Sequence, residues 1–202
     1  IVVTEGGFGF DLGAEKFLDI KCRVAGLWPH AVVIVATLKA LKFHGGADVK
    51  ECTQPNVDAL KKGFANLKKH VETARAFGLD PVVAINLFPT DEDAELKILE
   101  SMVHEIGCKV ARASGYAHGA EGGLALADIM SDVLANAPAE PKPHFLYDLT
   151  DSLPTKIEKI AKTVYGASGI ELSAQAHKDL AKVAAAGLGE TPICMAKTHL
   201  SL

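Results

Sequence analysis

The stretch PVVAINLFPTDEDAEL, which runs from Pro81 to Leu96, decides the fold class of this chain. Its first part is a run of small and β-branched apolar residues between Pro81 and Pro89, and this pattern predicts a buried strand. Thr90 and Asp93 follow at the spacing of a capping box, with Asp in place of the usual Glu, and predict the start of a helix. A buried strand that leads directly into a helix is typical of a parallel sheet with crossover helices.

The same alternation of strands and helices extends over most of the chain. One stripe of apolar residues at intervals of three and four predicts a long amphipathic helix; it consists of Val57, Leu60, Phe64, Leu67, Val71 and Ala74. Further strands are predicted at 1–4, 31–37, 109–113 and 191–196, and further helices at 14–21, 124–134, 154–163 and 173–185. We therefore expect an α/β fold with a parallel, doubly wound sheet. The proline-rich connector Ala137–His144 predicts a first domain at 1–138 and part of a smaller α/β domain at 139–202.

The overall composition excludes several classes of protein. The 202 residues carry a net charge of −4 and no basic block, so nucleic acid is not an expected partner. The longest apolar run, at 31–37, is too short to span a membrane. The four cysteines are widely separated, which favours reduced thiols in a cytoplasmic protein. Because Ile1 already stands inside an apolar run, we expect an interior piece of a longer chain.

Loops at the carboxyl ends of the predicted strands carry the candidate ligand-binding residues, because such sheets bind ligands there. Phe88 and Tyr116 stand on successive loops, and aromatic rings in that position can stack on a planar heterocycle. By analogy with P-loop nucleotide-binding folds, Asn86, Pro89 and Ser114 are candidates for nucleotide binding. Core packing of Phe88 and simple helix capping after Pro89 are the alternatives.

Other familiar signals are missing or weak. The sequence has no GxxxxGK[ST] phosphate-binding loop, and its eight histidines and four cysteines show no metal-ligand spacing. The acidic residues Asp11 and Glu15 lie near a predicted helix start, where we expect them to be solvated. Metal ligands are therefore not predicted in this chain.

Several longer motifs resemble one known family. VVTEGGFGFDLGAEKFLDIKCR, VATLKALKFHGG, NLKKHVETARAFG, VVAINLFPTDEDAEL, GAEGGLALA, IAKTVYGASGI and PICMAKTHLSL occur in the order typical of formate–tetrahydrofolate ligases. The resemblance covers the full chain and corresponds to a later-middle part of such a ligase. It implies a P-loop-NTPase-like main domain with smaller α/β domains, and a family P-loop lysine and formate-binding arginine that lie outside this chain.

The resemblance also implies an activity and a set of partners. The family uses ATP with Mg²⁺ to join formate to tetrahydrofolate through formyl phosphate, and its members are typically homotetramers. In the family an aromatic pair encloses the pterin ring, and its positions correspond here to Phe88 and Tyr116, with Phe8 of the GFG motif expected to line the cleft. The present chain departs from the family pattern at several positions, with Tyr116 in place of Trp, His118 in place of Lys and Lys39 in place of Arg. A non-catalytic pterin- or nucleotide-binding or oligomerisation module is the alternative function.

Overall fold

The computed structural model describes residues 1–196, so the end of the PICMAKTHLSL motif lies outside the described residues. Backbone contacts divide these residues into two compact units, each described here by itself. We call residues 29–75 and 79–141 the sheet unit, and residues 1–28, 76–78 and 142–196 the helical unit. The expected domain boundary after residue 138 stays a prediction.

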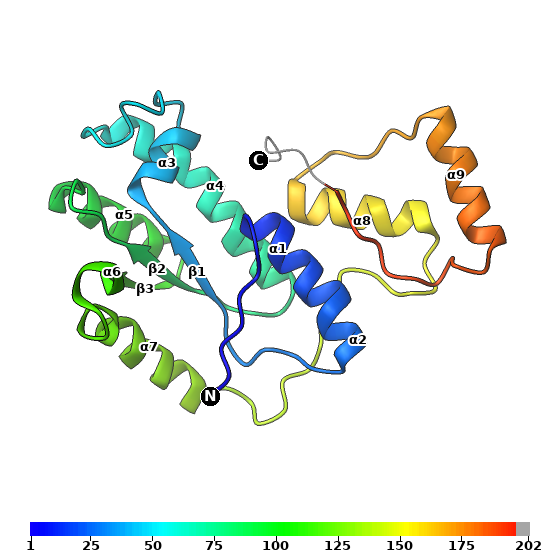
Figure 1. The fold of residues 1–202 in the computed structure, drawn as a ribbon, viewed down its shortest axis with the longest axis horizontal. Coiled ribbons are helices and arrows are strands. Elements are labelled where there is room, and N and C mark those ends of the chain that lie inside the picture. The colour runs from blue at the N-terminus through cyan, green and yellow to red at the C-terminus, as the bar shows by residue number, and fades with distance from the viewer. Residues whose placement is uncertain (197–202) are drawn as a thin grey trace. The chain divides into compact units, whose positions relative to one another are not determined.

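The sheet unit is built on three parallel strands in the order β1-β2-β3 (Figure 1). β1 is Val33–Ala36, β2 is Val82–Asn86 and β3 is Lys109–Ala113. The register places Val35 beside Ala84 and Ala84 beside Ala111. The α/β class and the parallel pairing are therefore confirmed, while the likeness to a P-loop sheet stays a prediction.

Crossover helices link the three strands. They are α3 Leu38–His44 and α4 Val57–Ala76 between β1 and β2, and α5 Asp93–Glu105 between β2 and β3; α6 Gly115–His118, the 3-10 turn Glu121–Gly123 and α7 Leu124–Ala135 follow β3. The apolar stripe predicted for α4 is confirmed, because the side chains from Leu60 to Ala74 on that stripe are buried. Packing of this stripe, rather than helix propensity alone, stabilises a helix of this length.

Helices cover both faces of the sheet (Figure 1). On β3, Arg112 forms an ion pair with Glu100 of α5, whereas Lys109 forms one with Asp132 of α7. Successive strand residues point to opposite faces, so side chains three positions apart lie on different sides. α5 and α7 therefore pack on opposite faces of the same sheet.

The helical unit begins with one continuous helical segment. α1 Phe10–Lys16 passes into a π-helical turn at Phe17–Cys22 and then into α2 Arg23–Ala25, which extends well beyond the helix predicted at 14–21. α8 Leu153–Tyr165 and α9 Ala174–Ala185 follow, each with a serine cap at its start. A small core of Tyr147, Ile160 and Val164 holds this unit together.

Three local predictions were wrong. Residues 1–4 form no strand and are exposed, because they have no pairing partner among the described residues. Residues 191–196 also form no strand, since Ile193 donates its amide to the Tyr147 hydroxyl at 3.0 Å instead of to a neighbouring backbone. The capping box at Thr90 and Asp93 does not form: the N-cap of α5 is Glu92, without a side-chain cap, and Asp93 is drawn into ion pairs.

Candidate ligand-binding site

The loops that follow β2 and β3 meet at the carboxyl edge of the sheet. The amide of Leu87 donates to the carbonyl oxygen of Ala113 at 2.8 Å, which continues the ladder one step past the last residue of β2. Asn86 is the last residue of β2, Phe88 and Pro89 follow this bond on one loop, and Ser114 and Tyr116 follow it on the other. The structure thus places five of the six predicted binding residues at the ends of two adjacent strands or on the loops that follow them.

Phe88 stands on a short, internally bonded turn. The Asp91 carboxylate accepts the Phe88 amide at 2.8 Å, and the Asp91 amide donates to the Phe88 carbonyl at 3.0 Å. The Phe88 side chain is 46% exposed, so it is not a core residue. Asp91 therefore shapes the loop that carries an open aromatic ring, because its side chain reaches back to a main-chain amide three residues earlier.

Tyr116 lies in the short helix α6 and is fully exposed. Its loop is closed by the Ser114 amide, which donates to the Gly122 carbonyl at 2.9 Å, and by a 3.0 Å hydrogen bond between the Ser114 hydroxyl and His118 Nδ1. A Cβ atom on Gly122 would lie 2.6 Å from the carbonyl carbon of Ser114, so only glycine permits this approach. The glycines of this loop are evident in the sequence, but the approach of Gly122 to Ser114 could not be predicted from it.

Phe8, the third predicted folate residue, belongs to the helical unit. It is 92% exposed and has a φ of 63°, a left-handed conformation that is rare for a bulky side chain. Such backbone strain costs on the order of 1–3 kcal/mol and tends to occur at functional positions. Its expected place beside the other two rings stays a prediction.

A buried ion pair lies beneath the loops of the sheet unit. Lys42 Nζ is 2.9 Å from Glu95 Oε2, and both side chains are at most 2% exposed. Lys42 also donates to the Gln54 carbonyl, and Glu95 accepts the Asn56 amide at 2.7 Å. This pair fastens the long loop after α3 to the first turn of α5, and no sequence pattern predicts it.

Three carboxylates on the first helical segment contradict the expectation of a solvated cluster. Asp11, Glu15 and Asp19 are at most 3% exposed, because their spacing of four places them on one inward face. Neither Glu15 oxygen has a hydrogen-bond partner among residues 1–196, and burial, followed by the charge of Asp19, raises the pKa of Glu15 to about 8. Burial likewise raises the pKa of Asp19 to about 6, although its Oδ1 accepts the Leu146 amide.

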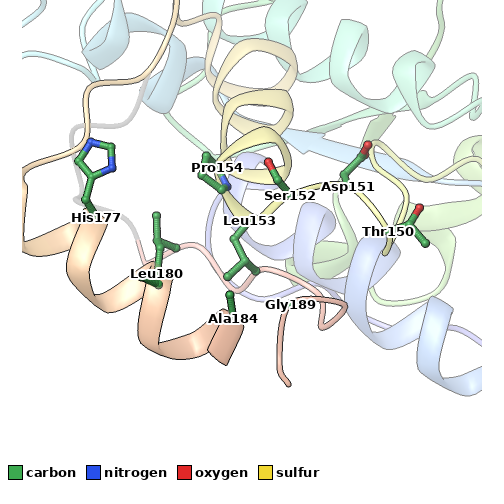
Figure 2. Close-up of a pocket in the computed structure, with 10 residues that line it drawn as sticks. Thr150, Asp151, Ser152, Leu153, Pro154, His177, Leu180, Ala184 and Gly189 are labelled. Carbon is green, nitrogen blue, oxygen red and sulfur yellow. The ribbon is translucent and has the colours of Figure 1, made fainter. Parts of the chain in front are cut away.

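A separate hollow lies within the helical unit, between the start of α8 and one side of α9. It has a volume of about 420 Å³, and Figure 2 shows Leu153 and Pro154 across from His177, Leu180 and Ala184. None of the six predicted binding residues lines it. Its apolar walls carry no charged group without a partner, since Asp151 is paired with Lys159.

Within residues 1–196, no group of three or more His, Cys, Asp or Glu side chains is arranged to hold a metal ion. In the same part of the chain, no helix combines the length and apolar composition needed to cross a membrane.

The sheet, its covered faces and the open loops at its carboxyl edge define an α/β protein whose strand-end loops carry the candidate binding residues. Residues 1–202 match the family described as formate–tetrahydrofolate ligase, and the chain belongs to that family. It is 49% identical over 202 residues to a formate–tetrahydrofolate ligase of Myxococcus xanthus (strain DK1622), and 46% identical over 200 residues to one of Parabacteroides distasonis (strain ATCC 8503). These matches cover 100% and 99% of the chain but only 37% and 36% of the relatives, so the chain spans little more than a third of their length.

Proposed function

We propose that this chain supplies the folate-binding segment of a formate–tetrahydrofolate ligase. The supporting observation is the pair of open rings, Phe88 and Tyr116, on adjacent strand-end loops of a chain that belongs to this family. The complete reaction joins formate to tetrahydrofolate at the expense of ATP, through formyl phosphate. In this proposal the ligase is cytoplasmic and homotetrameric, as the family resemblance implies.

The residues of this chain act by binding and orientation. A pterin is a flat heterocycle, and the faces of Phe88 and Tyr116 offer it stacking surfaces with little loss of side-chain entropy. Asn86, Pro89 and Ser114 contact the nucleotide, and Phe8 keeps the folate-binding role that the family resemblance implies. Holding the folate amine in a fixed orientation lowers the entropic barrier to its attack on the activated formyl group.

ATP arrives with Mg²⁺, which neutralises phosphate charge during transfer. As the family resemblance implies, Mg²⁺ and the phosphates are bound mainly by residues outside this chain. The P-loop lysine and formate-binding arginine of the family are assigned outside this chain as well. The isolated 202 residues should therefore bind folate without forming 10-formyltetrahydrofolate.

Replacing Phe88 with Ala in the longer ligase tests the proposal. Loss of one stacking face, worth about 1–3 kcal/mol, should raise the KM for tetrahydrofolate about tenfold or more and leave the KM for formate unchanged. Phe43→Ala is the matched control, because Phe43 is 50% exposed but lies at the far end of α3. Equal changes in both KM values, or an equal effect of the Phe43 variant, would refute the stacking role.

The alternative is a non-catalytic pterin-binding or oligomerisation module. The departures from the family pattern at Tyr116, His118 and Lys39 favour it. A ligase activity that requires this segment would exclude the alternative. Tetrahydrofolate binding that no ligase activity accompanies, in any longer form of the protein, would support it.

A further inference from the structure

A fork of ion pairs joins β3 to α5, the strand before the Tyr116 loop and the helix after the Phe88 loop. Arg112 is on β3, two residues before Ser114, and its guanidinium binds both oxygens of Glu100 on α5, with Nε to Oε1 at 2.7 Å and Nη2 to Oε2 at 2.8 Å. The remaining nitrogen, Nη1, donates to Asp93 Oδ1 at 2.6 Å. All three types of guanidinium nitrogen are thus engaged by one neighbouring helix.

The two acidic partners of Arg112 lie on α5, so the fork links this helix to β3. Asp93 is the first residue of α5 and follows Phe88 by five positions, with the Asp91 turn between them. Arg112 precedes Tyr116 by four positions at the end of β3. A single side chain on β3, the strand that leads into the Tyr116 loop, therefore holds α5, the helix that begins directly after the Phe88 loop.

We propose that Arg112 is a positioning residue that fixes the spacing between the Phe88 and Tyr116 loops. This inference rests on the proposed folate-binding function and adds to it a specific control of site width. The planar guanidinium has the geometry for a two-point contact with Glu100 and a third contact with Asp93, whereas an ammonium group has no such fork. Stacking on both faces of a ring needs a narrow range of separations, so a small shift of α5 relative to β3 weakens binding.

The ion pairs alone do not establish this role, because partly exposed pairs contribute little to stability. The Arg112 side chain is 30% exposed and Asp93 is 58% exposed, and pairs of this kind are typically worth about 0–1 kcal/mol. The expected effect is therefore on ligand affinity and not on the stability of the fold. Lys109 provides the matched control: it lies on the same strand and pairs with Asp132, but at the amino end and on the opposite face.

The test compares Arg112→Lys, Arg112→Met and Lys109→Met in the longer ligase. We expect both Arg112 variants to raise the Kd for tetrahydrofolate, measured by equilibrium dialysis, about fivefold or more, with the KM for formate unchanged. Lys109→Met should bind as the parent protein does. Wild-type affinity in Arg112→Lys would overturn the inference, as would an equal loss in Lys109→Met.

Phe88→Ala separates failure of the inference from failure of the proposed function. If Phe88→Ala leaves the tetrahydrofolate Kd unchanged, the proposed function fails. If it raises the Kd while Arg112→Lys does not, only the positioning role fails. Because Arg112 is proposed to act through the ring, Arg112→Lys should cause little further loss in the Phe88→Ala background, and a fully additive loss would contradict the inference.

Discussion

Replacing Glu15 with Gln should make the helical unit less sensitive to alkaline pH. Burial raises the pKa of Glu15 from 4.5 to about 8, and neither of its oxygens has a hydrogen-bond partner among the described residues. Between these two pH values the unfolded chain loses the Glu15 proton while the folded chain keeps it. The unfolded state then binds fewer protons, so the free energy of unfolding falls as the pH rises.

The size of the effect follows from the two pKa values. Each unit of difference is worth about 1.4 kcal/mol, which gives a loss of about 3 kcal/mol at pH 7 and about 5 kcal/mol at pH 9 relative to pH 4. Asp19, whose pKa is raised to about 6, adds a smaller loss that is complete at lower pH. The two carboxyl groups interact, so their contributions are not additive.

Urea unfolding at constant ionic strength and at pH 5, 7 and 9 measures this loss. Trp28, the only tryptophan, is buried in the helical unit against Phe145, with ring centroids 5.4 Å apart, so its fluorescence reports on that unit. Glu15→Gln should remove most of the fall above pH 5, whatever constant cost the unpaired amide adds. Glu171→Gln, at an exposed position of the same unit, should follow the parent protein. Parallel pH profiles for the parent protein and Glu15→Gln would refute the reasoning.

Two further predictions concern the sheet unit. Gly122→Ala places a methyl group 2.6 Å from the Ser114 backbone and should destabilise the protein by about 1–3 kcal/mol. Gly123→Ala, which has open space around it, should change stability by less than about 0.5 kcal/mol. Thermal unfolding of the two variants tests this, and equal melting temperatures would contradict it. Glu95→Gln leaves the Lys42 ammonium buried without its counter-charge and should cost about 3–5 kcal/mol in urea unfolding, so a loss below about 1 kcal/mol would show that the pair is dispensable.

The elements predicted best are those in which the pattern of apolar residues directly reflects which side chains are buried. The stripe in α4 alternates with the period of a helix, and the run at 82–86 is apolar on both faces because β2 is the central strand of three. The strand at 109–113 was predicted with the bounds observed for β3. In each case the sequence pattern and the burial that explains it belong to the same residues.

Predictions failed where the outcome depends on distant partners. Residues 1–4 have the composition of a strand but need a neighbouring strand to form one. Thr90 and Asp93 have the spacing of a cap, yet Asp93 is held by Arg112 from another element. Glu15 is a carboxylate near a helix start, where a solvated side chain is expected, but it faces inward. An arginine within the otherwise apolar end of a predicted strand was the one available sign of the fork.

The strand-end loops were predicted as a site from the order of the elements, from the aromatic residues on these loops and from the family resemblance. That order fixes which loops share an edge, and the exposed rings of Phe88 and Tyr116 are compatible with the predicted role. The contacts around these loops could not be predicted, because Arg112 and Asp93 are 19 residues apart in the sequence and the close approach of Gly122 to Ser114 depends on the backbone path.

The segment around residues 189–193 is fastened by two side chains and not by a strand ladder. Lys156 donates to the carbonyl oxygens of Gly189 and Thr191, and the Tyr147 hydroxyl accepts the Ile193 amide. A strand ladder opens from its end one hydrogen bond at a time, whereas this segment is held by two side chains and opens as one unit. The amides of Thr191 and Ile193, which donate hydrogen bonds in this segment, should therefore show the same opening free energy in hydrogen–deuterium exchange.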